Sequence, residues 1–401
     1  MRILFISYDF PYPPTGGSIS RDYNLIKQLS KNHELHWINR TIRGDIRQEY
    51  IDEMDKYFKN IKIVKWDYKQ NIPGLLKSFF TDIPYIIKRF ESEEMNKIVR
   101  ETINDNVFDL VLCDHIYLTQ YLPDNITDKI PVIPNNEDCG FTYYKRMTAN
   151  SGFLRSLYAG SQWKKLLNYE IKVLKKYNVY ITTSEKEKEM ISGYYDKAEI
   201  CVIDNGVDTK FFSERDRKDH SPNIIFTAWF KYYPNAQAAI DFVKNIFPKI
   251  QKEIPEIKFY IVGKEPPQKV MDLQKIENVF VTGYVDDIRE YLRNADAAVI
   301  PLQIGGGTRL KILEAMSMKI PVVSTHLGAE GLEVENRTNI LLAGNDKEFA
   351  EHVIEVIRDK QLSTNLTDNA RLLMEEKYDW QKIGNRLNDF INSFVKNFNK
   401  K

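Results

Sequence analysis

The segment from residue 300 to residue 316 combines three glycines, a hydroxyl group, two cations and a carboxylate, between a predicted buried strand and a predicted helix. Glycines let backbone N–H groups approach an anion because no Cβ stands in the way. A helix N-terminus presents free N–H groups and a partial positive charge. The segment therefore predicts a phosphate cradle, and a tight turn with surface cations is the alternative. Its candidate residues are Gly305, Gly306, Gly307, Thr308, Arg309, Lys311 and Glu314.

The charged members of this cradle have separate expected roles. Arg309 and Lys311 supply positive charge that stabilises a departing diphosphate, which makes them the candidate catalytic cations. Glu314 lies about two turns into the predicted helix, where its carboxylate can accept hydrogen bonds from a ribose diol.

Two other candidate sites follow predicted strands in the first half of the chain. Gly16 and Gly17 come after an apolar strand over residues 3–7. The dinucleotide fingerprint GxGxxG, with an acidic residue about 20 positions further on, is absent there, which disfavours a dehydrogenase. His115 follows a buried strand over residues 110–113, at the edge where a parallel sheet places its ligands. The alternatives are an ordinary strand–helix loop and a structural histidine.

The elements that must position these residues alternate along the chain as short apolar runs and longer amphipathic stretches. This alternation predicts parallel sheets with helices on both faces. The series restarts after the turn signal Asn205-Gly206-Val207-Asp208. We therefore predict the α/β class, with two Rossmann-like, doubly wound domains and a cleft between them. The first covers residues 1–205, with a C-terminal helix over 381–401 packing back on it, and the second covers residues 206–380.

The composition excludes several classes of protein and site. The formal net charge is +1 over 401 residues, so we expect no nucleic-acid partner. Cys113, Cys139 and Cys201 lie far apart without a CxxC pair, which disfavours a disulfide framework or a zinc site and favours a reducing compartment. The first apolar run is too short for a signal peptide, and no run reaches the ~20 residues of a spanning helix. We expect a cytoplasmic protein.

Residues 141–176 form a basic and aromatic stretch in a chain whose total charge is near zero. They carry eight Lys and Arg residues against one acid, Glu170. Lysines interleaved with aromatic residues suit an anionic bilayer surface or a lipid-linked diphosphate. The stretch therefore predicts a peripheral contact with the inner face of a membrane. A solvated helix face whose aromatic residues belong to the core is the alternative.

The sequence Glu314-Ala315-Met316 resembles the end of the donor-binding motif Glu-x7-Glu of the family 4 retaining glycosyltransferases, which have the GT-B fold. Glu314 matches the second Glu, which in the family holds the donor ribose. Gly306 stands at the first Glu, as in a subgroup with GGGT-(R/K)-x-K-x-LEAM. Many members have an Arg and a Lys on the diphosphate where this chain has Trp229 and Asn235. Arg309 and Lys311 are expected to supply that missing charge.

The resemblance also implies roles for the other candidates. The segment Val281-Thr282-Gly283-Tyr284-Val285 resembles the one that cups the nucleobase, so Gly283, Tyr284 and Val285 are expected to bind the donor. Gly16-Gly17 resembles a glycine loop near the donor phosphates. His115 resembles a histidine that contacts the donor sugar near the reacting carbon. Asn136-Glu137 resembles part of an acceptor-side segment, HN-x-E, with Asn135 in place of its His.

A member of this family would transfer a hexosyl group from a nucleoside diphosphate sugar to an acceptor hydroxyl, with retention of configuration. The acceptor would be a carbohydrate or a lipid-linked molecule, in the synthesis of a surface polysaccharide, lipopolysaccharide or glycolipid. We expect no metal and no cofactor, because no DxD-type pair stands in a convincing loop. Two alternatives stay open: a nucleotide-sugar 2-epimerase on the same fold, and a catalytically silent subunit that binds sugar nucleotides.

Overall fold

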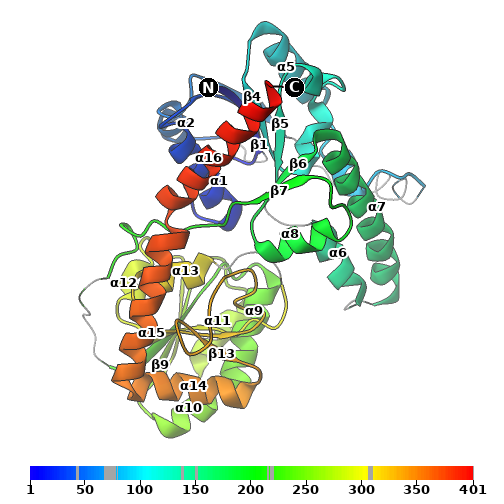
Figure 1. Cartoon of the computed structure of the whole chain (residues 1–401). Coiled ribbons are helices and arrows are strands. Elements are labelled where there is room, and N and C mark those ends of the chain that lie inside the picture. The colour runs from blue at the N-terminus through cyan, green and yellow to red at the C-terminus, as the bar shows by residue number, and fades with distance from the viewer. Residues whose placement is uncertain are drawn as a thin grey trace. The chain divides into compact units, whose positions relative to one another are not determined.

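The computed structural model describes residues 1–41, 45–66, 78, 80–136, 140–149, 152–214, 216, 221–305 and 310–400. The chain divides into two compact units, shown in Figure 1. The first unit comprises Met1–Asp204 and Gly384–Lys401, and the second comprises Asn205–Ile383. Each unit is built around its own parallel sheet.

The first unit contains a seven-stranded parallel sheet in the order β3-β2-β1-β4-β5-β6-β7. Its central strands are apolar and buried, as expected for parallel strands covered on both faces. The strand order reverses at the neighbours β1 and β4, so ligands are expected at their carboxyl ends. The strands are β1 Arg2–Tyr8, β2 Glu34–Thr41, β3 Asn60–Lys65, β4 Leu110–Asp114, β5 Val132–Asn135, β6 Val179–Thr182 and β7 Glu199–Val202.

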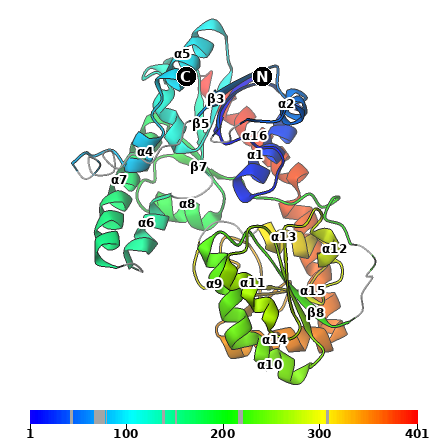
Figure 2. The ribbon, with the colours of Figure 1, turned by 180° about the vertical axis from the view of Figure 1, so that it is seen from behind.

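Helices connect these strands, and two of them, α6 and α7, lie side by side in both views (Figures 1 and 2). The last helix, α16 Trp380–Phe398, begins in the second unit and belongs to the first from Gly384 onwards. A Cβ at Gly384 would lie 2.5 Å from the Cβ of Gln28, so α16 packs closely on α1. The other helices of the unit are α1 Gly17–Leu29, α2 Gln48–Asp55, α4 Tyr85–Arg89, α5 Glu93–Asp105, η1 Ile116–Tyr121, η2 Ile126–Asp128, α6 Gly140–Ala149, α7 Phe153–Tyr177 and α8 Glu185–Ser192.

The second unit contains a six-stranded parallel sheet in the order β10-β9-β8-β11-β12-β13. The order reverses at the neighbours β8 and β11, which places the ligand edge of this sheet at their carboxyl ends. The predicted α/β class with two doubly wound, Rossmann-like sheets is therefore confirmed. The strands are β8 Asn223–Thr227, β9 Lys258–Val262, β10 Val279–Gly283, β11 Ala297–Ile300, β12 Val322–Thr325 and β13 Leu341–Ala343.

Helices cover both faces of the second sheet, with α9 and α10 on one face and α13 on the other (Figure 2). Their buried residues form one core with the strands. The helices are α9 Tyr233–Asp241, η3 Phe242–Ile246, α10 Phe247–Glu253, α11 Gln268–Met271, η4 Asp272–Lys275, α12 Arg289–Leu292, α13 Leu310–Ser317, α14 Asp346–Arg358, α15 Lys360–Leu373 and η5 Met374–Tyr378.

Candidate functional site

The candidate donor site of the second unit lies where β8 and β11 end. β11 continues into a loop that reaches Gly305 and then, beyond a gap in the described residues, into α13. Gly305 has a φ of 117°, a conformation that favours glycine. Gly306, Gly307, Thr308 and Arg309 lie outside the described residues, so their roles as the phosphate cradle stay predictions.

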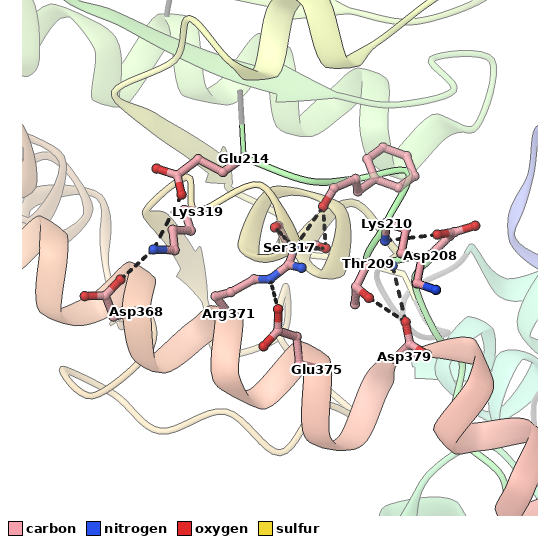
Figure 3. Close-up of polar contacts among 11 residues, drawn as sticks. Asp208, Thr209, Lys210, Glu214, Ser317, Lys319, Asp368, Arg371, Glu375 and Asp379 are labelled. Atoms are coloured by element: carbon pink, nitrogen blue, oxygen red, sulfur yellow. Dashed lines mark hydrogen bonds and ion pairs between the residues drawn. The ribbon is translucent and has the colours of Figure 1, made fainter. Parts of the chain in front are cut away.

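Helix α13 carries the two cradle residues that the structure describes, Lys311 and Glu314. Ile312, Leu313, Ala315 and Met316 are buried in the core, which leaves Lys311 and Glu314 one turn apart on a partly buried face. The other end of α13 is held by α15, as Figure 3 shows: Arg371 donates to the carbonyl oxygen and hydroxyl group of Ser317. The helix that presents the two charged groups is therefore fixed at its far end.

The ammonium group of Lys311 is directed to the end of β8. Its Nζ donates to Oδ1 of Asn235 at 3.1 Å and lies 4.7 Å from the ring centroid of Phe226, a buried residue of β8. A cation over an aromatic face is favourable by about 0.5–2 kcal/mol. The structure thus places a positive charge at the edge where the sheet is expected to bind its ligand.

Glu314 follows Lys311 by one turn and is partly buried. Burial raises the pKa of Glu314 to about 7, and the charge of Lys311 opposes this increase. Within the described part of the chain, its carboxyl group has no hydrogen-bond partner. A carboxyl group in this state gains from a ligand that donates hydrogen bonds, such as a diol.

The predicted nucleobase segment lies at the end of β10, beyond β9 in the same sheet. Gly283 has a φ of 70°, and its carbonyl oxygen accepts a hydrogen bond from the backbone of Gly263 at 3.1 Å. The side chain of Tyr284 is 66% exposed, while Val285 packs against the core. Base binding by Gly283, Tyr284 and Val285 stays a prediction.

In the first unit, His115 lies directly after β4, at the switch point of the sheet. Its φ of 68° with ψ of 135° is unusual for a residue with a side chain, and such strain costs about 1–3 kcal/mol and gathers at functional sites. The buried imidazole lies between the rings of Tyr8 and Tyr117, at centroid distances of 4.7 and 5.8 Å. Its Nε2 is 3.7 Å from Oδ2 of Asp114.

A buried hydrogen-bond network fixes the strand ends around His115. Oδ1 of Asp114 accepts from Nδ2 of Asn135 at 2.8 Å, and Oδ1 of Asn135 accepts from Nη2 of Arg21 at 3.2 Å. Arg21 also donates to the carbonyl oxygen of Asp204 at 3.0 Å, and Asp204 pairs with Arg386 at 2.7 Å. The sequence interpretation missed this network because its members are far apart in the chain and form no motif.

The other candidates of the first unit are placed as follows. Gly16 and Gly17 are exposed at the start of α1, and a Cβ on Gly17 would meet no atom within 4 Å. Asn136 is buried after β5, and its backbone N–H donates to Ile181 at 3.0 Å. Glu137 lies outside the described residues. The donor and acceptor roles of these four residues stay predictions.

The described residues offer neither a metal cluster nor a helix that could span a membrane. They contain no group of three or more His, Cys, Asp or Glu residues that could hold a metal ion. Asp287, of the adjacent pair Asp286-Asp287, forms an ion pair with Arg289 at 2.7 Å. Across the same residues, no helix combines the length and the apolar composition that crossing a bilayer requires.

Comparison with known proteins relates the second unit to a family of enzymes. Residues 221–359 match the family model described as glycosyl transferases group 1. The chain is 26% identical over 402 residues to an uncharacterized 44.6 kDa protein in the cps region of Klebsiella pneumoniae, covering 95% of this chain and 97% of that protein. It is 26% identical over 148 residues to the capsular polysaccharide biosynthesis glycosyltransferase CapM of Staphylococcus aureus, covering 35% of this chain and 39% of CapM.

Solved structures match this chain over nearly its full length. The crystal structure of Anabaena HepE in complex with UDP and glucose matches with a TM-score of 0.67 at 14% identity, covering 98% of this chain and 100% of that chain. At this level of identity, the likeness shows the fold. The two Rossmann-like sheets and the likeness to solved structures show the GT-B fold, and the match of residues 221–359 to glycosyl transferases group 1 supports a transferase enzyme.

Proposed function

We propose that this protein transfers a hexosyl group from a nucleoside diphosphate sugar to an acceptor hydroxyl, with retention of configuration at the transferred sugar. The observation that carries the proposal is the pair Lys311 and Glu314 at the switch point of the group 1 domain. A held ammonium group suits a diphosphate, and a carboxyl group without a partner among the described residues suits a ribose. HepE, solved with UDP and glucose, supports UDP sugars as the first donors to test.

In this reaction the bond between the anomeric carbon and a diphosphate oxygen breaks, and the acceptor oxygen bonds to that carbon. Negative charge develops on the departing diphosphate, where Lys311, Arg309 and the N–H groups of residues 305–308 stabilise it. The departing phosphate oxygen can take the acceptor's proton, so no side-chain base is needed. We place His115 against the donor sugar, and the reaction as proposed uses neither a metal nor a cofactor.

We further propose that the acceptor is a carbohydrate or a lipid-linked sugar of a surface polysaccharide, lipopolysaccharide or glycolipid. The names of two relatives, one in a cps region and one in capsular polysaccharide biosynthesis, support this role. In this proposal, Gly16 and Gly17 border the donor, while Asn136 and Glu137 border the acceptor.

Helix α7 and its neighbourhood support a peripheral contact with an anionic membrane surface, reached from the cytoplasm. The acid of the basic stretch, Glu170, is buried, and exposed lysines line the helix. Leu157 is 55% exposed and Phe80 is 89% exposed. Residue 78, close to Phe80 in the chain, accepts a hydrogen bond from Lys165 of α7. The exposed lysines are Lys145, Lys164, Lys172, Lys175 and Lys176.

Some aromatic residues of the same stretch belong to the core, as the alternative interpretation of a solvated helix face expects. Phe141 is fully buried, and Tyr158 and Trp163 are partly buried. The side chains of Tyr143, Arg146, Phe153, Leu154 and Arg155 lie outside the description. The apolar contribution to membrane binding is therefore assigned to Leu157 and Phe80, and the charge to the lysines.

The first test of the proposed function is a thermal-shift screen against UDP, GDP, ADP, CMP and their sugars. A ligand that binds only the folded state stabilises it by about 2.7 kcal/mol at a hundred times its dissociation constant. We expect one nucleoside diphosphate to raise Tm clearly. Flat traces across the panel at millimolar ligand would contradict the proposal.

Product analysis then separates the proposed reaction from its two rivals. A transferase releases the nucleoside diphosphate faster when an acceptor is present, and NMR of the product shows the donor's anomeric configuration. A 2-epimerase inverts the configuration at C2 of the donor sugar and ignores acceptors. A silent subunit binds the nucleotide and neither transfers nor hydrolyses the sugar.

A further inference from the structure

The side chain of Lys311 meets three elements of the second unit at the switch point of its sheet. It projects from α13, its Nζ donates to Asn235 of α9 at 3.1 Å, and the same atom lies 4.7 Å from the ring centroid of Phe226 in β8. A lysine side chain has about 2 kcal/mol of rotamer entropy to lose when it is held in one place. These contacts therefore select one position for the ammonium group before any ligand arrives.

Asn235 is itself held in one orientation. Its Nδ2 donates to the carbonyl oxygen of Trp229 at 2.9 Å, and its backbone N–H donates to Tyr232 at 3.0 Å. Because a carbonyl oxygen can only accept, it fixes the amide with the nitrogen toward Trp229 and the oxygen toward Lys311.

The loop that supplies the Trp229 carbonyl group is braced against the end of β9. Backbone N–H groups of Ala228 and Phe230 donate to Val262 and Lys264, both at 3.0 Å. Gly263 has a φ of 147°, and a Cβ there would lie 1.7 Å from the carbonyl oxygen of Ala228. Hydrogen bonds thus connect the end of β9 to the loop after β8, that loop to Asn235, and Asn235 to the ammonium group of Lys311.

The chemistry of the partner distinguishes this contact from the ion pairs elsewhere in the unit. Lys319 pairs with Asp368 at 2.9 Å and Lys275 with Asp272 at 2.8 Å, and each carboxylate neutralises its lysine. The amide of Asn235 orients the ammonium group and leaves its charge intact. The nearby carboxyl group of Glu314 has a pKa raised to about 7 by burial, so at neutral pH it offsets that charge only in part.

We propose that Asn235 is a positioning residue of the diphosphate site: it holds the Lys311 ammonium group at the carboxyl end of β8, where that charge binds the β-phosphate of the donor. This inference rests on the proposed function. In this arrangement, Asn235 of α9 positions the cation that Lys311 of α13 provides.

The test compares UDP and UMP, which differ by the β-phosphate, by calorimetry on the full chain. Wild type should prefer UDP. Asn235→Ala should lower the UDP-over-UMP preference about tenfold, or about 1.4 kcal/mol, mainly through weaker UDP binding. Lys311→Asn should do the same. In the Lys311→Asn background, Asn235→Ala should have no further effect on the preference, because Asn235 acts through Lys311. Lys244→Asn, an exposed lysine of the same unit, is the matched charge control.

If the Asn235–Lys311 contact only holds α13 and α9 together, Asn235→Ala should lower Tm and weaken the binding of UDP and UMP equally. That result would overturn the proposal. So would an unchanged UDP preference in Asn235→Ala, or additive effects of the two changes. If Asn235→Ala does not fold, the nearly isosteric Asn235→Leu serves instead: it keeps the volume of the side chain and removes the amide that Lys311 contacts, and the proposal again predicts loss of the UDP preference. Wild type that binds neither UDP nor any nucleotide of the screening panel would instead refute the proposed function.

Discussion

Replacing Glu314 is expected to change the stability of the nucleotide-free protein and its affinity for nucleotide in opposite directions. Its pKa is raised from 4.5 to about 7, chiefly by burial. The folded state therefore binds a proton more tightly than the unfolded state. The difference of about 2.5 pKa units corresponds to about 3 kcal/mol at most. This cost is absent below pH 4.5, grows as the pH rises toward 7 and is fully present above 7.

Replacing the carboxyl group by an amide removes that cost. Glu314→Gln should therefore raise the free energy of unfolding of the nucleotide-free protein at pH 8, by up to about 3 kcal/mol. Below pH 4.5, where both states of the wild type are protonated, the gain should disappear. Urea unfolding at pH 8 and at the lowest pH where the protein stays folded measures the difference. An equal effect at both pH values would refute the assigned pKa.

Binding should respond in the opposite direction. If the ionised carboxyl group accepts the ribose hydroxyls, wild-type affinity for UDP-glucose should fall about tenfold per pH unit below 7. Glu314→Gln should bind more weakly at pH 8 and lose this pH dependence, and Glu314→Ala should weaken binding by about 1–3 kcal/mol. UDP-glucose is preferred to UDP because its esterified diphosphate has no titration near pH 6. Unchanged affinity of Glu314→Ala in calorimetry would remove Glu314 from the site.

Three further predictions concern other parts of the chain. Lys311→Ala and Arg309→Ala should each lower kcat by about a hundredfold or more without changing which base is preferred; wild-type rates in both would reject the cationic clamp. Gly263→Ala should destabilise the second unit by about 2 kcal/mol or more in urea unfolding, because its Cβ would strike the carbonyl oxygen of the loop after β8. Gly160→Ala, within α7, is its control and should be neutral or stabilising, because its Cβ would lie at an ordinary contact distance of 3.9 Å from Cγ2 of Thr148. Co-sedimentation with anionic vesicles should weaken with salt and with Leu157→Glu; no binding at low salt would show that α7 is an ordinary solvated face.

Several features of the structure follow from local sequence patterns. Apolar runs such as Ile3–Ile6 and Ile224–Phe226 are short, are bounded by polar residues and alternate with amphipathic stretches. Such runs can satisfy their backbone groups and bury both faces only in a parallel sheet between helices. The expected edges for ligands follow as well, since His115 comes directly after β4 and Gly305 lies in the loop that follows β11. The type of fold was therefore predictable, as were the strand ends near which the candidate residues lie.

The properties of individual site residues depend on groups that are distant in the chain. The sequence predicted Lys311 as a cation of the phosphate cradle, but only the tertiary structure brings it to Asn235 and Phe226. The Asp114–Asn135–Arg21 network likewise joins two strand ends to the first helix. A local motif cannot encode such contacts, because they arise when the sheet order brings separate elements together.

The sequence by itself determined the two doubly wound sheets, because strand and helix periodicity is a property of neighbouring residues. It also determined which residue types stand at the ends of the strands. Only the tertiary structure decided how those residues behave. Burial raises the pKa of Glu314, and a neutral amide orients Lys311 without cancelling its charge. Both effects depend on how far the folded chain excludes water from each group and on which groups it places beside it.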